Sequence, residues 1–139
     1  MEFRYDHLTT QDLRGTSRAE LLVNIEANLS VVDADGPVFQ EDLFPVAELA
    51  RDLSRWAAQP EEKRENFEWE SMSYDEKGTV RIHATEAGWR LGSVQTPDSW
   101  SRPVSWPELL GSIRDYVARV RRDIEALGID SAFIEANDD

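Results

Sequence analysis

The sequence predicts an α+β fold in which an antiparallel sheet of about four strands carries two helices packed on one face. Three patterns predict this fold. Apolar and polar residues alternate over residues 23–31, apolar residues recur every three or four positions over 45–57 and 106–127, and residues 67–95 contain three short strand-like runs. Two amphipathic helices need an apolar sheet face to cover, which favours two layers. Length predicts one domain, residues 1–139.

The clearest strand is predicted over residues 20–33. Its inward-facing positions are Val23, Ile25, Ala27, Leu29 and Val31, and polar residues lie between them. The sequence Asp-Ala-Asp-Gly-Pro at 33–37 is typical of a turn and ends this strand. A further short strand is predicted at 3–5.

Pro45 is expected to begin the first helix, because the missing N–H of proline costs nothing in the first turn. The side chains predicted to face the core are Val46, Leu49, Ala50, Leu53, Trp56 and Ala57. Gln59-Pro60 ends this helix, and residues 61–66 form a charged connector.

Residues 67–95 are predicted to form a three-stranded meander with turns at 75–78 and 87–88. Its register has two alternatives. A four-residue loop at 75–78 places Phe67 and Trp69 on the inner face, whereas a three-residue loop with a bulge at Gly78 places Met72 and Tyr74 there. We favour the first alternative, because the second turns two glutamates toward the core.

Residues 96–105 are predicted to form a Pro/Ser-rich loop, followed by a second helix. Ser105 and Glu108 have the spacing of a capping box, and Gly128 suits the position just after the helix. The buried stripe is predicted to comprise Leu109, Leu110, Ile113, Tyr116, Val117, Val120, Ile124 and Leu127. The acidic tail at 129–139 is expected to be loose.

Negative charge is concentrated in one part of the chain. The net charge is −13, and residues 33–76 contain thirteen Asp/Glu and four Lys/Arg, a balance of −9. Such a surface repels nucleic acid and anionic membranes and attracts basic partners. No apolar run approaches the ~18 residues of a membrane span. With no cysteine and no apolar stretch at the N-terminus, we expect a cytoplasmic protein.

Few residues in the sequence suggest a catalytic or metal-binding site. In the favoured register Glu70 lies opposite His83, with Arg81 nearby, and such a pair can act as an acid–base couple. A solvated cross-strand pair explains these residues more simply. Asp33 and Asp35 resemble the start of a calcium loop, but the later ligands are missing and turn chemistry accounts for them. We therefore expect no catalytic residues, metal or cofactor.

Partner binding is the better-supported interpretation of the surface. The carboxylates expected to contact a partner are Glu61, Glu62, Glu65, Glu68 and Glu70, within an acidic set that also includes Glu41, Asp42, Asp75 and Glu76. Trp100 and Arg102 are expected to anchor the rim, because Trp and Arg are enriched at interface hot spots. The alternative for Trp100 and Trp106 is that both indoles cover the core.

Three segments carry a family resemblance: Phe-Pro-Val-x-Glu-Leu-Ala at 44–50, Ser-Met-Ser-Tyr at 71–74 and Gly-Trp-Arg-Leu-Gly-Ser at 88–93. Together with Leu53, Trp56 and Phe67 they resemble an uncharacterised family of small acidic proteins from actinobacteria. The resemblance implies a shared fold and no catalytic residue. In size, acidity and α+β pattern the chain also resembles immunity proteins of bacterial toxin systems.

The favoured interpretation is therefore an acidic binding protein. Its concrete form would be an immunity-type inhibitor that blocks a basic protein partner. One alternative is a phage-type inhibitor that mimics nucleic acid, although the predicted helices carry mixed charges. Another is a small-molecule-binding domain or enzyme that uses the Glu70/His83 face.

Overall fold

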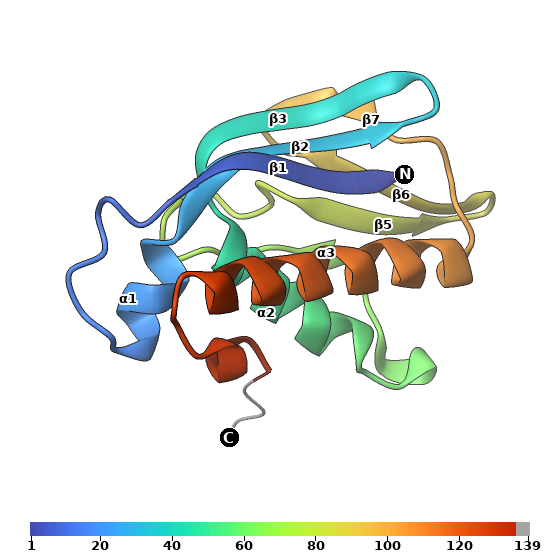
Figure 1. The fold of residues 1–139 in the computed structure, drawn as a ribbon. Coiled ribbons are helices and arrows are strands. Elements are labelled where there is room, and N and C mark those ends of the chain that lie inside the picture. The colour runs from blue at the N-terminus through green and yellow to red at the C-terminus, as the bar shows by residue number, and fades with distance from the viewer. Residues whose placement is uncertain (136–139) are drawn as a thin grey trace.

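The computed structural model describes residues 1–135 and confirms an α+β fold (Figure 1). The expected single sheet is wrong, because the strands form two antiparallel sheets: sheet A, with the order β1-β2-β3, and sheet B, with the order β4-β5-β6-β7. The elements follow in this order along the chain: β1 (Glu2–Thr9), α1 (Arg18–Val23), β2 (Glu26–Asp33), β3 (Gly36–Pro45), α2 (Val46–Ala57), the 3-10 helix η1 (Glu61–Lys63), β4 (Phe67–Glu68), β5 (Arg81–Thr85), β6 (Gly88–Ser93), β7 (Thr96–Trp100), α3 (Trp106–Ala126) and the 3-10 helix η2 (Ser131–Ile134).

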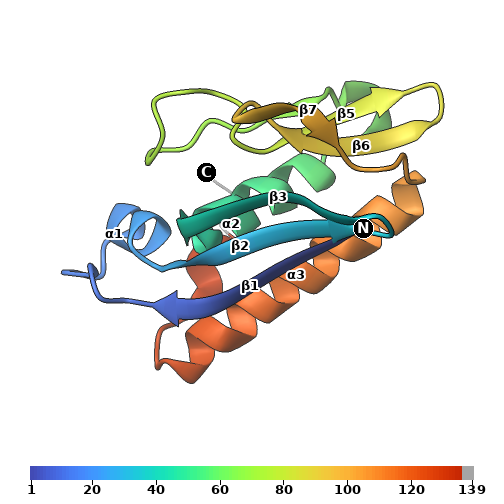
Figure 2. The same ribbon diagram turned by 90° about the horizontal axis from the view of Figure 1, so that it is seen from above.

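Helices α2 and α3 lie together beneath sheet A, as expected, and sheet B lies beyond the β3 edge (Figure 2). The two sheets share one apolar core. Phe44 at the end of β3 stacks on Trp69 with ring centroids 5.1 Å apart, and Trp56 of α2 lies 5.5 Å from Phe67 of β4. Phe44 of β3 and Trp56 of α2 therefore both pack against sheet B.

The strand predicted over residues 20–33 is shorter than expected. Ser17 Oγ accepts a hydrogen bond from the Glu20 backbone N–H at 3.2 Å and caps α1, so the first part of this segment is helical. The alternation from Ile25 to Val31 is confirmed, and β2 pairs with β1, which includes the strand predicted at 3–5.

Strand β3 was not predicted, because irregularities interrupt its alternation. Val38 and Phe39 are consecutive and both buried, and the register with β2 shifts twice. Leu43 has a φ of 52° and is 62% exposed, so an apolar residue occupies an outward, left-handed position. The turn predicted at 33–37 is confirmed as the β2–β3 hairpin.

The inner face predicted for residues 67–69 is correct, but the predicted pairing is wrong. Phe67 and Trp69 are buried, yet Phe67 pairs with Ile82 and only two residues of β4 join the ladder. Residues 70–77 then form a longer loop than the expected four-residue hairpin loop, closed by the Gly78 N–H donating to the Trp69 carbonyl at 2.8 Å.

Glu48 fixes this loop against the first turn of α2. Its side chain is buried, and its carboxylate accepts hydrogen bonds from Ser71 Oγ at 2.7 Å and from the Met72 N–H at 2.8 Å. Burial is the main reason that the pKa of Glu48 is raised above its ordinary value. Two hydrogen bonds to a carboxylate acceptor stabilise the loop that the structure has in place of the expected short hairpin.

Two further predictions about the C-terminal half are corrected. Residues 96–100 form β7 and not a loop, and Leu127 is 50% exposed instead of buried. Helix α3 is confirmed, with Ser105 Oγ accepting from the Glu108 N–H at 3.3 Å and Gly128 at a φ of 83° just after it. The part of the tail that the structure describes is not loose, because Ile134 of η2 is buried; the prediction for 136–139 lies outside the described residues.

Candidate functional site

Three tryptophans meet at the end of α2. Trp56 of α2, Trp89 of β6 and Trp106 of α3 lie with ring centroids 5.5 Å apart for the first pair and 5.6 Å for the other two. Such separations are within the favourable range for aromatic pairs. Trp56 is buried, whereas Trp89 and Trp106 are half-buried and leave part of each indole at the surface. We call this set the tryptophan cluster.

Backbone pairing brings the cluster together. The Trp89 N–H donates to the Val104 carbonyl at 2.8 Å, and the Val104 N–H donates back to Trp89 at 2.9 Å. Gly88 makes this crossing possible, because a Cβ there would lie 2.6 Å from the Val104 oxygen. The cap at Ser105 then starts α3, so Trp106 lies beside Trp89.

The connector predicted at 61–66 packs directly on this cluster. The Trp56 Nε1–H donates to the Glu65 carbonyl at 2.8 Å. The Arg64 guanidinium lies over the Trp106 ring, with Cζ 3.8 Å from the ring centroid, and its Nη2 donates to the Gln59 carbonyl at 2.8 Å. A cation over an indole face is a favourable arrangement. The chain's own arginine therefore shows how this surface holds a guanidinium.

Three of the predicted partner-binding carboxylates belong to the same connector. Glu61, Glu62 and Glu65 are exposed, and none forms an ion pair with any residue among 1–135. They belong to the same connector as Arg64, whose guanidinium lies over Trp106, a residue for which the sequence left an interface role and a core role open.

The other two predicted carboxylates lie elsewhere. Glu68 is on β4, where it hydrogen-bonds His83 Nε2, so the expected Glu70–His83 pair is wrong. The register explains this, because Glu68 pairs with Arg81 and its side chain reaches the next residue on that face. Glu70 is exposed in the following loop and lies 3.9 Å from Lys77 Nζ.

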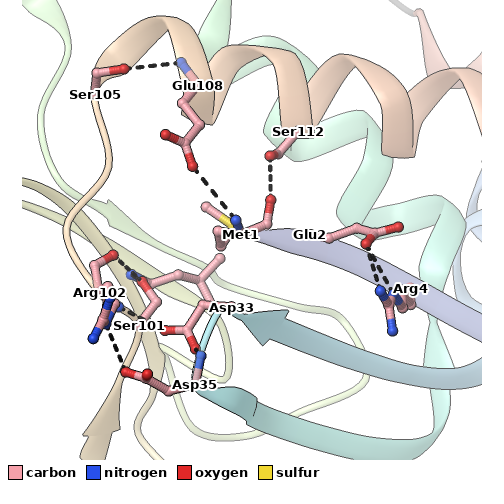
Figure 3. Close-up of polar contacts among 11 residues, drawn as sticks. Met1, Glu2, Arg4, Asp33, Asp35, Ser101, Arg102, Ser105, Glu108 and Ser112 are labelled. Carbon is pink, nitrogen blue, oxygen red and sulfur yellow. Dashed lines mark hydrogen bonds and ion pairs between the residues drawn. The ribbon is translucent and has the colours of Figure 1, made fainter.

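Arg102 joins the two sheets (Figure 3). Its Nε donates to Asp35 at 2.8 Å, and its backbone N–H donates to Asp33 at 2.8 Å. This N–H is the main reason that the pKa of Asp33 is held below its usual value. Asp33 also accepts from the Asp35 N–H at 2.8 Å, which confirms the turn interpretation of this acidic pair.

Trp100 is the remaining predicted anchor. It is half-buried on the outer face of sheet B, beside His83. Among residues 1–135, no group of three or more His, Cys, Asp or Glu side chains is placed to hold a metal ion.

Sequence reasoning missed Arg64 and Trp89 as parts of a site. Arg64 belonged to a run that showed only charge, and Trp89 belonged to a predicted strand. The only available signal was the unusual placement of an arginine among connector glutamates, close after a helix that ends in tryptophan.

A family model described as a domain of unknown function (DUF7878) matches residues 1–126. This agrees with the expected resemblance to an uncharacterised family. No curated protein and no solved structure matches the chain. Within residues 1–135, no helix combines the length and apolar character needed to cross a membrane.

Proposed function

We propose that this chain, which belongs to the DUF7878 family of unknown function, binds and inhibits a basic protein partner. The concrete form is an immunity-type inhibitor that covers a basic cleft. One observation carries the proposal: Arg64 stacks on Trp106 within a connector whose three glutamates form no ion pair with any residue among 1–135.

The tryptophan cluster supplies the apolar part of the proposed interface. Trp and Arg dominate interface hot spots because large, rigid side chains exclude water around a few strong contacts. A partner arginine that replaced Arg64 over Trp106 would gain the same cation–π contact and would lie near Glu61, Glu62 and Glu65.

The overall charge would assist encounter. With a net charge of −13, the protein attracts cations over distances set by the salt concentration. The screening length is about 10 Å at 0.1 M salt. Association should therefore slow as salt rises, whereas dissociation should depend mainly on the contacts at Trp106. Inhibition would follow from steric cover of the partner's cleft.

Capture from a lysate of the source organism tests the proposal. The tagged protein is compared with E61Q/E62Q/E65Q and with the control E86Q/D98N/D115N, which changes the net charge equally at exposed positions outside the connector. We expect one basic protein to be retained by wild type and control at low salt and lost from the connector variant.

Arg64→Gln separates the two parts of the interface. If a partner arginine takes the place of Arg64, removing the guanidinium should leave binding intact or strengthen it. Retention of the same partner by the connector variant and the control alike would contradict the proposal.

A further inference from the structure

Positive charge gathers on the outer face of sheet B, in contrast to the rest of this acidic chain. Alternation along β5 turns Arg81, His83 and Thr85 to this face, while Ile82 between them is buried. Arg90 of β6 pairs with His83 across the ladder and is exposed. The acidic side chain that contacts this group is Glu68, which hydrogen-bonds His83.

Trp100 forms a platform on this face. Gly92 leaves room for its ring, because a Cβ at Gly92 would lie 2.8 Å from Trp100 Cε3. The Arg81 guanidinium lies 4.7 Å from one Trp100 ring centroid, and the His83 ring lies 5.0 Å away. Arg81 and His83 are thus already engaged, one with the indole and the other with Glu68.

A small hollow opens between these side chains. It has a volume of about 160 Å³ and is lined by His83, Thr85, Arg90 and Trp100. At ~30 Å³ per water molecule this is room for a group of only a few heavy atoms. Arg90 makes no ion pair with any residue among 1–135, so its guanidinium remains available.

We propose that this hollow binds a carboxylate group, held by Arg90 and seated against the Trp100 indole. A guanidinium presents parallel N–H groups that match the two oxygens of a carboxylate. The indole would contact the adjoining carbon atoms, and the small volume suits a group of carboxylate size. The site uses no residue of the connector, so it stands independently of the proposed partner interface.

The carboxylate has two possible sources, a small organic acid or an Asp or Glu side chain of a peptide. Titrations monitored by ¹H–¹⁵N NMR distinguish them, with sodium acetate as one probe and a blocked aspartate, N-acetyl-aspartate methylamide, as the other. Sodium chloride at matched ionic strength is the reference.

We expect saturable shifts at the amides of His83, Arg90 and Trp100 with at least one probe. Arg90→Gln should weaken binding about tenfold, and Arg90→Lys should weaken it less because a point charge is retained. Arg114→Gln, at another exposed arginine, is the matched control and should bind as wild type.

The two probes identify the source. Tighter binding of blocked aspartate indicates a peptide side chain, and equal or tighter binding of acetate indicates a small acid. Shifts that do not saturate beyond the chloride reference, or equal affinity for wild type and Arg90→Gln, would overturn the proposal. The spectra of the variants also report whether each is folded.

Discussion

The same substitution at two glycines should change stability in opposite directions. Gly92 has an ordinary backbone conformation, so an alanine there is strained only by its surroundings. Its Cβ would lie 2.8 Å from Trp100 Cε3, 3.0 Å from Cδ2 and 3.1 Å from the Ser99 carbonyl oxygen. Because backbone as well as ring must move, we expect Gly92→Ala to lower the free energy of unfolding by about 1–3 kcal/mol.

Gly111 provides the matched control. It lies inside α3, and a Cβ there would meet no heavy atom within 4 Å. Alanine is a better helix former than glycine, so Gly111→Ala should raise the free energy of unfolding by about 0.5–1 kcal/mol. The two variants add the same methyl group, but in α3 it enters open space, whereas in β6 it meets the Trp100 ring and the Ser99 carbonyl.

Urea denaturation followed by far-UV circular dichroism measures both effects. The midpoints should shift in opposite directions at an unchanged m-value, which shows that the surface exposed on unfolding is the same. If Gly92→Ala is as stable as wild type, the Trp100 ring does not rest on Gly92, and the hollow beside it loses its platform. A destabilised Gly111→Ala would contradict the use of α3 as an open control.

Three further predictions concern buried polar groups. Glu48→Ala should lower the free energy of unfolding by about 2 kcal/mol, because the Met72 N–H loses its charged acceptor. Faster hydrogen exchange at the Met72 amide would confirm this cause, and unchanged exchange would exclude it. Tyr116→Phe should lower the free energy of unfolding, measured by urea denaturation, by about 1 kcal/mol, because the Tyr116 hydroxyl donates to the Val46 carbonyl at 2.7 Å within the core. An unchanged free energy would show that this hydrogen bond does not contribute to stability. Stability should also depend on pH, because burial raises the pKa of several carboxyls. These are Glu26, Glu41, Glu48 and Asp52. A carboxyl whose pKa is raised in the folded state contributes its full stabilisation below its unfolded pKa, near about 4. This contribution is lost as the pH rises through the folded-state pKa. The free energy of unfolding should therefore increase as the pH falls from about 7 to about 5. A decrease over that range would refute this assignment.

Local patterns in the sequence were sufficient for the elements whose side chains repeat regularly. The stripe of α2, the capping serine at 105 and the alternation of β2 each lie within a few residues of chain, and the structure confirms them. Strand β3 was missed because shifts in register bring Val38 and Phe39 to the core together. Strand β7 was missed because its sequence, Thr-Pro-Asp-Ser-Trp, does not alternate.

The candidate sites show the same division. The exposure of the connector glutamates and the excess of negative charge follow from composition. That His83 meets Glu68 and not Glu70 depends on the register of β4 against β5, in which Glu68 pairs with Arg81. Likewise, Arg102 looked like a free anchor, but Asp35, 67 residues earlier in the chain, holds its guanidinium.

The α+β class, the two long helices, the β2 strand with its turn and the acidic surface could all be predicted from the sequence. Those properties depend on backbone propensity, periodicity and charge, which act between near neighbours. Only the tertiary structure decided that the strands form two sheets, that Arg64 lies on Trp106, and that a cationic hollow forms around Trp100. Each of these rests on packing between distant segments, where a shift of one or two residues in register changes which side chains meet.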